Sequence, residues 1–404
     1  MRWNGRRRPW VLVAMAVVGV LLAMVIWRTS TAGPARALRR DLAERAAEPW
    51  DALTGLQAAS ADVELCRAVR DGEQPFESLS QSCQRELEAG SRWLEALLSA
   101  THAAEAGAPV GLGTLDEPVP AGRPRGWSTL PYAGKLGALR IRQLLAAGDA
   151  GGAVRVCVDL QALARDASWG TGLAGRLPAL AVAEVAFRPC TAALDTAPSE
   201  VKRVAAGALA RVEEWTPSLA VVMREYALGA RGQAFAPYLG GLGGLPPEVA
   251  SWAREFAPGE RTDWRFTLAL GDAWHRIDGR LQQAVEAAGL PMPQRADRLD
   301  VIAAGERPWV NRRASFALPQ LGRAARSDAR ARSQLRLLRG ALGADLFRVE
   351  QGRWPTAAEL AGLLGSGEPL TVEPHEDTLT VVDPSVPRGE LAVSVRADGP
   401  RASR

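Results

Sequence analysis

The longest apolar stretch in the chain runs from Trp10 to Trp27 and contains no charged residue. An α-helix rises about 1.5 Å per residue, so this stretch would extend over roughly 27 Å, close to the ~30 Å hydrocarbon core of a bilayer. The two terminal tryptophans, Trp10 and Trp27, are typical of the lipid headgroup region. The pattern therefore predicts a single transmembrane helix, which anchors the chain in membrane lipid.

Arginines around the apolar stretch predict its orientation. Arg6, Arg7 and Arg8 lie almost directly before it, whereas the basic residues after Arg28 begin further along and are mixed with acids. Dense positive charge on the leading side favours a cytoplasmic N-terminus and an extracytoplasmic remainder, with the reverse topology as the alternative. The apolar core is longer than that of a cleavable signal, although Ala-Arg-Ala at 35–37 resembles a cleavage site. We predict a retained anchor in the inner (cytoplasmic) membrane and a periplasmic C-terminal domain; cleavage is the alternative.

After the anchor, apolar residues recur at the spacing of three and four positions that is typical of amphipathic helices. A first helix should leave the membrane as a stalk and end near Pro49, because proline interrupts helical hydrogen bonding. A hairpin of two helices is expected at 51–70 and 78–106, followed by a glycine- and proline-rich linker at 107–131. Further helices are predicted at 132–145, 153–167, 177–194, 199–215 and 263–288.

The pattern changes at residue 340, where β-type runs at 370–373, 378–382 and 391–395 follow a short helix. The predicted fold is mainly α. It has an N-terminal transmembrane helix, a helical-hairpin bundle as ectodomain, and a small C-terminal α+β module with a short antiparallel sheet. The predicted segments are a cytoplasmic tail and anchor (1–28), a stalk, hairpin and linker (29–131), a helical bundle (132–339) and the α+β module (340–404).

Net charge carries little information about partners. The chain has 49 basic and 45 acidic residues, and the first 28 residues hold five arginines and no acid. The remainder has 49 − 5 = 44 basic residues against 45 acids, so the basic isoelectric point does not indicate a nucleic-acid partner. Residues 295–339 hold eleven arginines against four acids. This region could contact an anionic surface, but a solvated helix face, with Arg332, Arg336 and Arg339 opposite a leucine stripe, explains it without a partner.

Four cysteines are an even number in a chain placed outside the cytoplasm, where disulfides persist. Three connectivities are possible. Proximity in sequence favours Cys66 with Cys83 and Cys157 with Cys190, because each pair would join two successive helices. A zinc site is the competing reading, but no pair has the two-to-four-residue spacing of such sites. We predict two disulfides and no metal or cofactor.

Residue patterns that carry catalytic chemistry are mostly missing. His102, His275 and His375 stand alone, without a second ligand type at helical spacing. Ser199 and Lys202 match the Ser-x-x-Lys pair of penicillin-recognising enzymes, but the partner motifs of that family are absent and Ser199 is expected to cap a helix instead. We therefore predict no catalytic residue.

Two further features invite a functional reading. The GGLGG run at 240–244 has neither a preceding strand nor a following Gly-Lys-Ser/Thr, so a connector is favoured over a phosphate loop. Exposed indoles often stack on sugars, but core packing is the favoured role for a cluster of four tryptophans, Trp252, Trp264, Trp274 and Trp309.

Residues 340–396 locally resemble the C-terminal part of type II secretion pseudopilins and of uncharacterised single-pass membrane-anchored bacterial envelope proteins. In these families a long helix ends in Gly-Arg-aromatic-Pro before a Leu-x-x-Leu helix. The resemblance implies a helix packed on a small antiparallel sheet. The pseudopilin processing site and its helical glutamate are absent, which puts filament assembly in doubt. The matching residues are Phe347, Arg348, Gly352, Arg353, Trp354, Pro355, Leu360 and Leu363.

The sequence predicts a membrane-anchored envelope protein with a binding or scaffolding role. Its expected partners are membrane lipid, through the N-terminal helix, and an envelope protein, with no nucleic acid. The alternatives are an extracytoplasmic enzyme with an unrecognised site, or an accessory component of a secretion or pilus-like system. An enzyme would need convergent polar groups in a pocket, which isolated histidines and only two lysines make harder to assemble.

Overall fold

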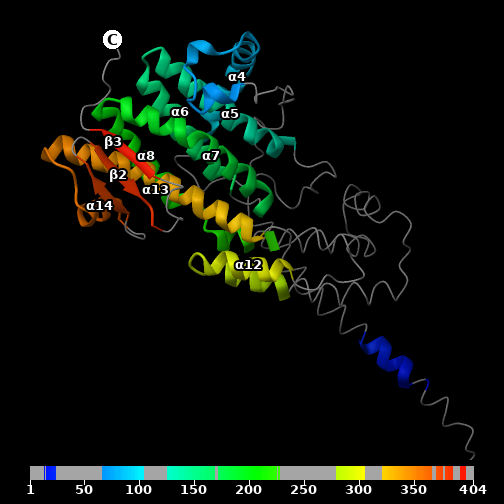
Figure 1. Cartoon of the computed structure of the whole chain (residues 1–404). Coiled ribbons are helices and arrows are strands. Elements are labelled where there is room, and N and C mark those ends of the chain that lie inside the picture. Colours follow the sequence, from blue (N-terminus) through cyan, green and yellow to red (C-terminus); the bar gives the residue numbers. More distant parts are fainter. Residues whose placement is uncertain are drawn as a thin grey trace, which may run out of the picture.

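Helices make up most of the structure, and a three-stranded antiparallel sheet lies near the C-terminus (Figure 1). This confirms the mainly helical class and the small C-terminal sheet. The stalk, the GGLGG run and the four clustered tryptophans lie outside the described residues. The computed structural model describes residues 13, 15–23, 66–103, 125–168, 172–224, 226–227, 279–304, 321–365, 370–375, 378–384 and 392–396.

The described helices between 78 and 215 follow the predicted order, with some different ends, whereas most of each helix predicted at 51–70 and 263–288 lies outside the described residues. Helical turns also cover residues 219–224 and 279–287. The labelled helices are α3 (Arg67–Arg70), the 3-10 helix η2 (Phe76–Ser78), α4 (Gln81–Ala103), α5 (Arg125–Ala146), α6 (Ala150–Asp166), α7 (Gly172–Thr196), α8 (Ser199–Trp215), α12 (Gln294–Ala304), α13 (Leu321–Gln351) and α14 (Ala357–Leu364).

The start of α5 differs from the prediction. Residues 125–131 were expected to belong to a linker, but α5 begins at Arg125 and includes Pro131. Proline removes one helical hydrogen bond. Leu130 and Ala133, on either side of it, are fully buried, so packing against the bundle outweighs that loss. Residues 125–131 are therefore helical, and the rest of the predicted linker lies outside the described residues.

Local sequence explains how α5 turns into α6. Gly148 has a φ of +79°, a left-handed conformation that glycine adopts without steric cost. Asp149 then caps α6, because its carboxylate accepts a hydrogen bond of 2.8 Å from the backbone N–H of Gly152.

Helices α5 and α7 pack closely at Gly134. A Cβ at this position of α5 would lie 2.9 Å from the Val182 backbone of α7. The glycine thus lets α5 and α7 approach closely.

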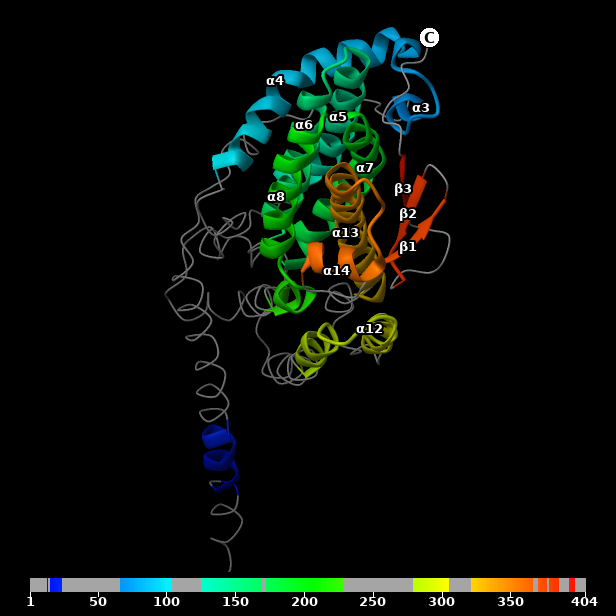
Figure 2. The ribbon, with the colours of Figure 1, turned by 90° about the vertical axis from the view of Figure 1, so that its left-hand side faces the viewer.

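The buried apolar side chains form two clusters. The main core contains side chains from all the helices between α3 and α8, from the second half of α13, from α14 and from the sheet. The small core joins the first turn of α7, residues 219–227 and 279–288, α12 and the first turns of α13. In both views α12 lies at the end of the bundle away from α4 (Figures 1 and 2). Helix α13 belongs to both cores and connects them.

The sheet has the order β1-β2-β3, formed by Thr371–Pro374, Thr378–Val382 and Ala392–Arg396. It packs on α13, which lies between α8 and the sheet (Figure 2). Gly340 allows this contact, because a Cβ there would lie 2.6 Å from Leu370. The expected boundary between residues 339 and 340 falls inside the continuous helix α13, and one hydrophobic core includes the bundle and the sheet.

The predicted membrane anchor is described at residues 13 and 15–23, which are helical and exposed throughout. This helix stands apart from the bundle in both views (Figures 1 and 2). Among the described residues, the helix that is long and apolar enough to cross a membrane is Gly175–Thr196. It lies within α7, and 56% of its apolar window is buried inside the protein, as expected of a core helix.

Candidate functional site

A groove lies between α7, α8, α13 and β3, with an empty volume of about 320 Å³. Three charged residues, Asp195, Lys202 and Asp345, line it together with apolar walls. Ligand sites combine apolar walls with a few placed polar groups, so this groove is the candidate site. The apolar lining comes from Leu194, Leu338, Ala341, Leu342, Val393 and Val395.

Lys202 is held firmly within the groove. Its Nζ donates to Asp345 Oδ2 at 2.6 Å and to the backbone carbonyl of Asp195 at 3.2 Å. Arg348 donates to the other Asp345 oxygen at 3.3 Å. Lys202 is only 8% exposed, so these two bonds fix the position of its side chain. The groove therefore offers apolar contact beside the Lys202–Asp345 ion pair.

The Ser-x-x-Lys match is structural. Lys202 is directed to Asp345 and the Asp195 carbonyl, contacts that give it a structural role. Ser199 is the first residue of α8, and the cap position belongs to Pro198, which makes no side-chain cap. The prediction that Ser199 caps this helix was therefore wrong. Pro198 has the extended backbone that a cap position needs, so the helix begins directly after it, at Ser199.

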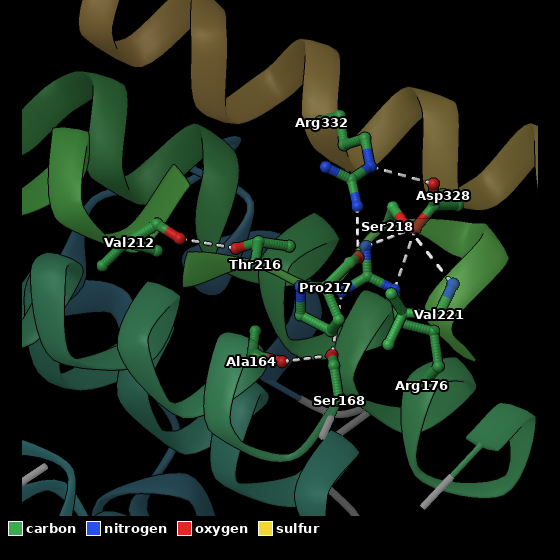
Figure 3. A network of polar contacts seen from close by, with 10 residues as sticks. All are labelled: Ala164, Ser168, Arg176, Val212, Thr216, Pro217, Ser218, Val221, Asp328 and Arg332. Carbon is green, nitrogen blue, oxygen red and sulfur yellow. Dashed lines mark hydrogen bonds and ion pairs between the residues drawn. The ribbon is translucent and has the colours of Figure 1, made fainter. Parts of the chain in front are cut away.

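A buried polar network lies where the two cores meet (Figure 3). Arg176 of α7 donates from Nε to Asp328 Oδ1 of α13 at 2.9 Å, and from Nη1 to Ser168 Oγ at 2.8 Å. Arg332 donates from Nε to the other Asp328 oxygen at 3.0 Å, and from Nη2 to the Pro217 carbonyl. The network thus ties α6, α7, α13 and the segment after α8 at one point.

Electrostatics hold Asp328 in its charged form. Burial alone would raise the pKa of Asp328, but the charges and hydrogen bonds of Arg176 and Arg332 outweigh it, so the pKa lies below its usual value. Burial lowers the pKa of Arg176, and Asp328 opposes that shift. Arg176 is 3% exposed and Asp328 is fully buried, so each depends on the other for charge compensation.

The three α13 arginines that were expected on a solvated face, Arg332, Arg336 and Arg339, are partly buried. Arg332 bonds to Asp328, and Arg336 bonds to Asp383 at 3.4 Å beside the sheet. Arg339 pairs with Glu213 of α8 and also donates to a backbone carbonyl at the end of α14. These arginines therefore join α13 to its neighbours. Of the expected leucine stripe, Leu335, Leu338 and Leu342 are buried, whereas Leu346 is partly buried.

The Gly-Arg-Trp-Pro turn after α13 is stabilised by stacked guanidinium and aromatic groups. Arg348 lies 5.0 Å from the ring centre of Trp354, and Arg353 lies 5.1 Å from that of Phe347. Arg353 also donates to both oxygens of Glu359, at 2.9 and 2.5 Å. Glu359 in turn completes a capping box with Thr356 at the start of α14. This motif therefore sets the angle between α13 and α14.

Both cysteine pairs suggested by the sequence lie at disulfide distance. The Cα atoms of Cys66 and Cys83 are 5.9 Å apart, and those of Cys157 and Cys190 are 5.3 Å apart. The first pair joins the start of α3 to α4, and the second joins α6 to α7 inside the main core. The two pairs therefore fix α3 against α4 and α6 against α7.

Of the three isolated histidines, His375 has a described side chain, which is exposed. His375 lies in the turn between β1 and β2, where its backbone N–H donates to the Thr378 carbonyl at 2.8 Å. His102 lies in α4, and His275 lies outside the described residues. Among the described residues, no group of three or more acidic, histidine or cysteine side chains is placed to hold a metal.

Sequence reasoning missed the groove and the buried network, because both depend on pairs far apart in the chain. An arginine at 176, in the largely apolar first half of α7, was an available signal for the network. No family model, curated protein or solved structure matches this chain.

Proposed function

We propose that this chain is a membrane-anchored protein of the bacterial cell envelope, whose helical ectodomain binds or holds a partner protein. The observation that carries the anchor is the helix at residues 15–23, where every residue is exposed and apolar. With residue 13, it presents seven large aliphatic side chains that are 53% to 67% exposed. Burying one such side chain fully stabilises by about 1.5–3 kcal/mol, so lipid is the environment that suits this helix.

An extracytoplasmic ectodomain agrees with the state of its cysteines. All four cysteines pair, and disulfides persist in oxidising compartments. The same pairs stiffen the bundle, since α3 is joined to α4 and α6 to α7. A rigid bundle on a single anchor suits a protein that presents a binding surface.

The groove supports binding over catalysis. Two of its three charged residues, Lys202 and Asp345, form an ion pair, and its walls are mostly apolar. The space open to the centre of a water-sized sphere is only about 20 Å³, so the groove is too small to enclose a drug-sized ligand. A groove of that size suits an apolar side chain of a partner protein better than a large substrate.

Alkaline extraction tests the anchor. The full chain should stay with the membrane, whereas Val18→Arg should move a large share into the soluble fraction, because a charge at the centre of a transmembrane helix costs about 2.5–3.5 kcal/mol. Val204→Arg, on the exposed face of α8, is the matched control and should leave the membrane fraction unchanged. Complete extraction of the unmodified chain would refute the anchor.

Photo-crosslinking in cells tests the binding role. A photoreactive residue at Ser394, on the groove wall, should give a discrete adduct with an envelope protein. The same residue at Val204, which is exposed on α8 and does not line the groove, should give no such adduct. Equal adducts from both positions, or none from Ser394, would contradict a partner at the groove.

A further inference from the structure

Three guanidinium groups gather around one carboxylate where α3 packs on α5. Arg67 and Arg70 belong to α3, Arg142 belongs to α5, and Asp71 directly follows α3. We call these four residues the arginine cluster. Next to it, the Cys66–Cys83 pair joins the start of α3 to α4, which fixes this segment on the bundle.

Arg70 is the innermost member of the arginine cluster, at 6% exposure. Its Nε donates to Asp71 Oδ1 at 2.8 Å and its Nη2 to Asp71 Oδ2 at 3.3 Å. Its Nη1 is buried and makes no hydrogen bond. A buried donor of a charged group without a partner costs free energy, and this cost falls if an acceptor reaches it.

Arg142 is placed by a glycine. Gly72 has a φ of +80°, and a Cβ at that position would overlap the guanidinium of Arg142, which therefore lies directly against the turn. The Nε of Arg142 donates to the Arg70 carbonyl at 3.4 Å, a long hydrogen bond. The side chain is half-buried, and its terminal nitrogens are not among the buried unpaired atoms. Its two-pronged edge can thus be reached from solvent.

The arginine cluster has more positive charge than Asp71 can compensate. Three guanidinium groups and one carboxylate give a net charge of +3 − 1 = +2. Glu73 follows in sequence, but no ion pair joins it to these arginines in the described part of the chain. Burial lowers the pKa of Arg142, with the charge of Asp71 opposing the shift. A half-buried, undercompensated guanidinium is favourably placed to receive an anion.

We propose that the arginine cluster binds a phosphoryl group, with Arg142 as the two-pronged donor and Arg67 as a second exposed cation. Paired N–H groups of a guanidinium match the geometry of phosphate oxygens, and Arg67 is already held beside the site by Asp71 at 3.4 Å. A phosphoryl group would reduce the excess charge that now surrounds Arg70. The phosphoryl group can come from a soluble molecule or from a lipid headgroup. This inference is independent of the groove and of the partner proposed for it.

Titration of the full chain in detergent with inorganic phosphate tests the soluble source, with calorimetry or amide chemical shifts as the readout. Arg142→Gln should weaken phosphate binding by about tenfold, the loss expected for one charge-assisted contact of ~1.4 kcal/mol. Arg142→Lys should weaken it less, because the charge remains and the two-pronged geometry is lost. The control is Arg140→Gln, whose arginine lies on the same helix and pairs with Glu95 and Gln143. It should change binding less than twofold.

Flotation with vesicles tests the lipid source. The full chain is reconstituted into neutral vesicles, and a second population of anionic vesicles is offered to its ectodomain. Bridging of the two populations that is lost in Arg142→Gln and kept in Arg140→Gln would assign the site to a lipid headgroup. Phosphate binding without bridging would assign it to a soluble molecule. The proposal is overturned if neither probe binds, or if both variants lose binding equally while their melting temperatures match the parent chain.

Discussion

Replacing Asp328 by asparagine tests whether the buried network holds the two cores together. The substitution keeps the shape of the side chain but leaves the guanidinium of Arg176 buried without its counter-charge. Removing one partner of a buried ion pair costs about 3–5 kcal/mol. Since domains are stable by about 5–15 kcal/mol, Asp328→Asn should remove a large share of the free energy of unfolding.

Chemical denaturation of the full chain in detergent at neutral pH measures this loss. Asp300→Asn is the matched control, because Asp300 pairs with Arg326 at 2.9 Å on an exposed surface. Exposed ion pairs contribute about 0.2–1 kcal/mol, so this variant should stay close to the parent chain. A loss below about 1 kcal/mol for Asp328→Asn would refute the role assigned to the network.

The same variant should change the response to acid. The pKa of Asp328 is lowered in the folded state, so the carboxylate contributes stability above its unfolded pKa of about 3.9. That contribution is lost as the pH falls through the folded pKa. The parent chain should therefore lose more stability on acidification than Asp328→Asn. Equal losses in the two proteins would contradict the lowered pKa.

Three further predictions concern other parts of the fold. Replacing both cysteines of the α6–α7 pair by serine should cost about 3–4 kcal/mol in denaturation, and a change near zero would contradict the bond. Gly134→Ala should destabilise by about 1–3 kcal/mol, because its Cβ meets the α7 backbone. Gly207→Ala on α8, where the new Cβ meets only the end of the Arg211 side chain at 3.9 Å, should stabilise by up to ~1 kcal/mol, and a Gly134→Ala protein as stable as the parent chain would refute the packing. Hydrogen bonds from Arg353 lower the pKa of Glu359 to about 2, and Arg353→Gln should raise it toward the usual value in an NMR titration, so an unchanged midpoint would contradict that bond.

Local signals predicted much of the fold. Pro198 and the glycine-rich turns mark real helix boundaries, and the helix expected at 199–215 has those ends in the structure. The three β-type runs are strands within one residue of the expected ends, because alternating apolar residues and the turn around His375 specify a hairpin. The cysteine pairs could be chosen because each joins neighbouring helices.

Long-range pairing could not be predicted from spacing. Arg176 and Asp328 are 152 positions apart, and Lys202 and Asp345 are 143 apart, so nothing local connects either pair. The partners of Arg336 and Arg339 in α13 could not be predicted for the same reason. The spacing of these arginines is that of a solvated face, and only the positions of α8 and the sheet show that acids meet them. The groove is formed by α7, α8, α13 and β3, which are far apart in the sequence, so it could not be predicted either.

The orientation of the anchor can be measured directly with a reporter that is active only outside the cytoplasm, fused after Arg404. We predict an active reporter on a protein that stays in the membrane fraction, because the dense arginines precede the apolar helix. The same reporter fused before Met1 should be inactive, which controls for export of the reporter by itself. An inactive C-terminal fusion would place the ectodomain in the cytoplasm and contradict the proposed envelope role.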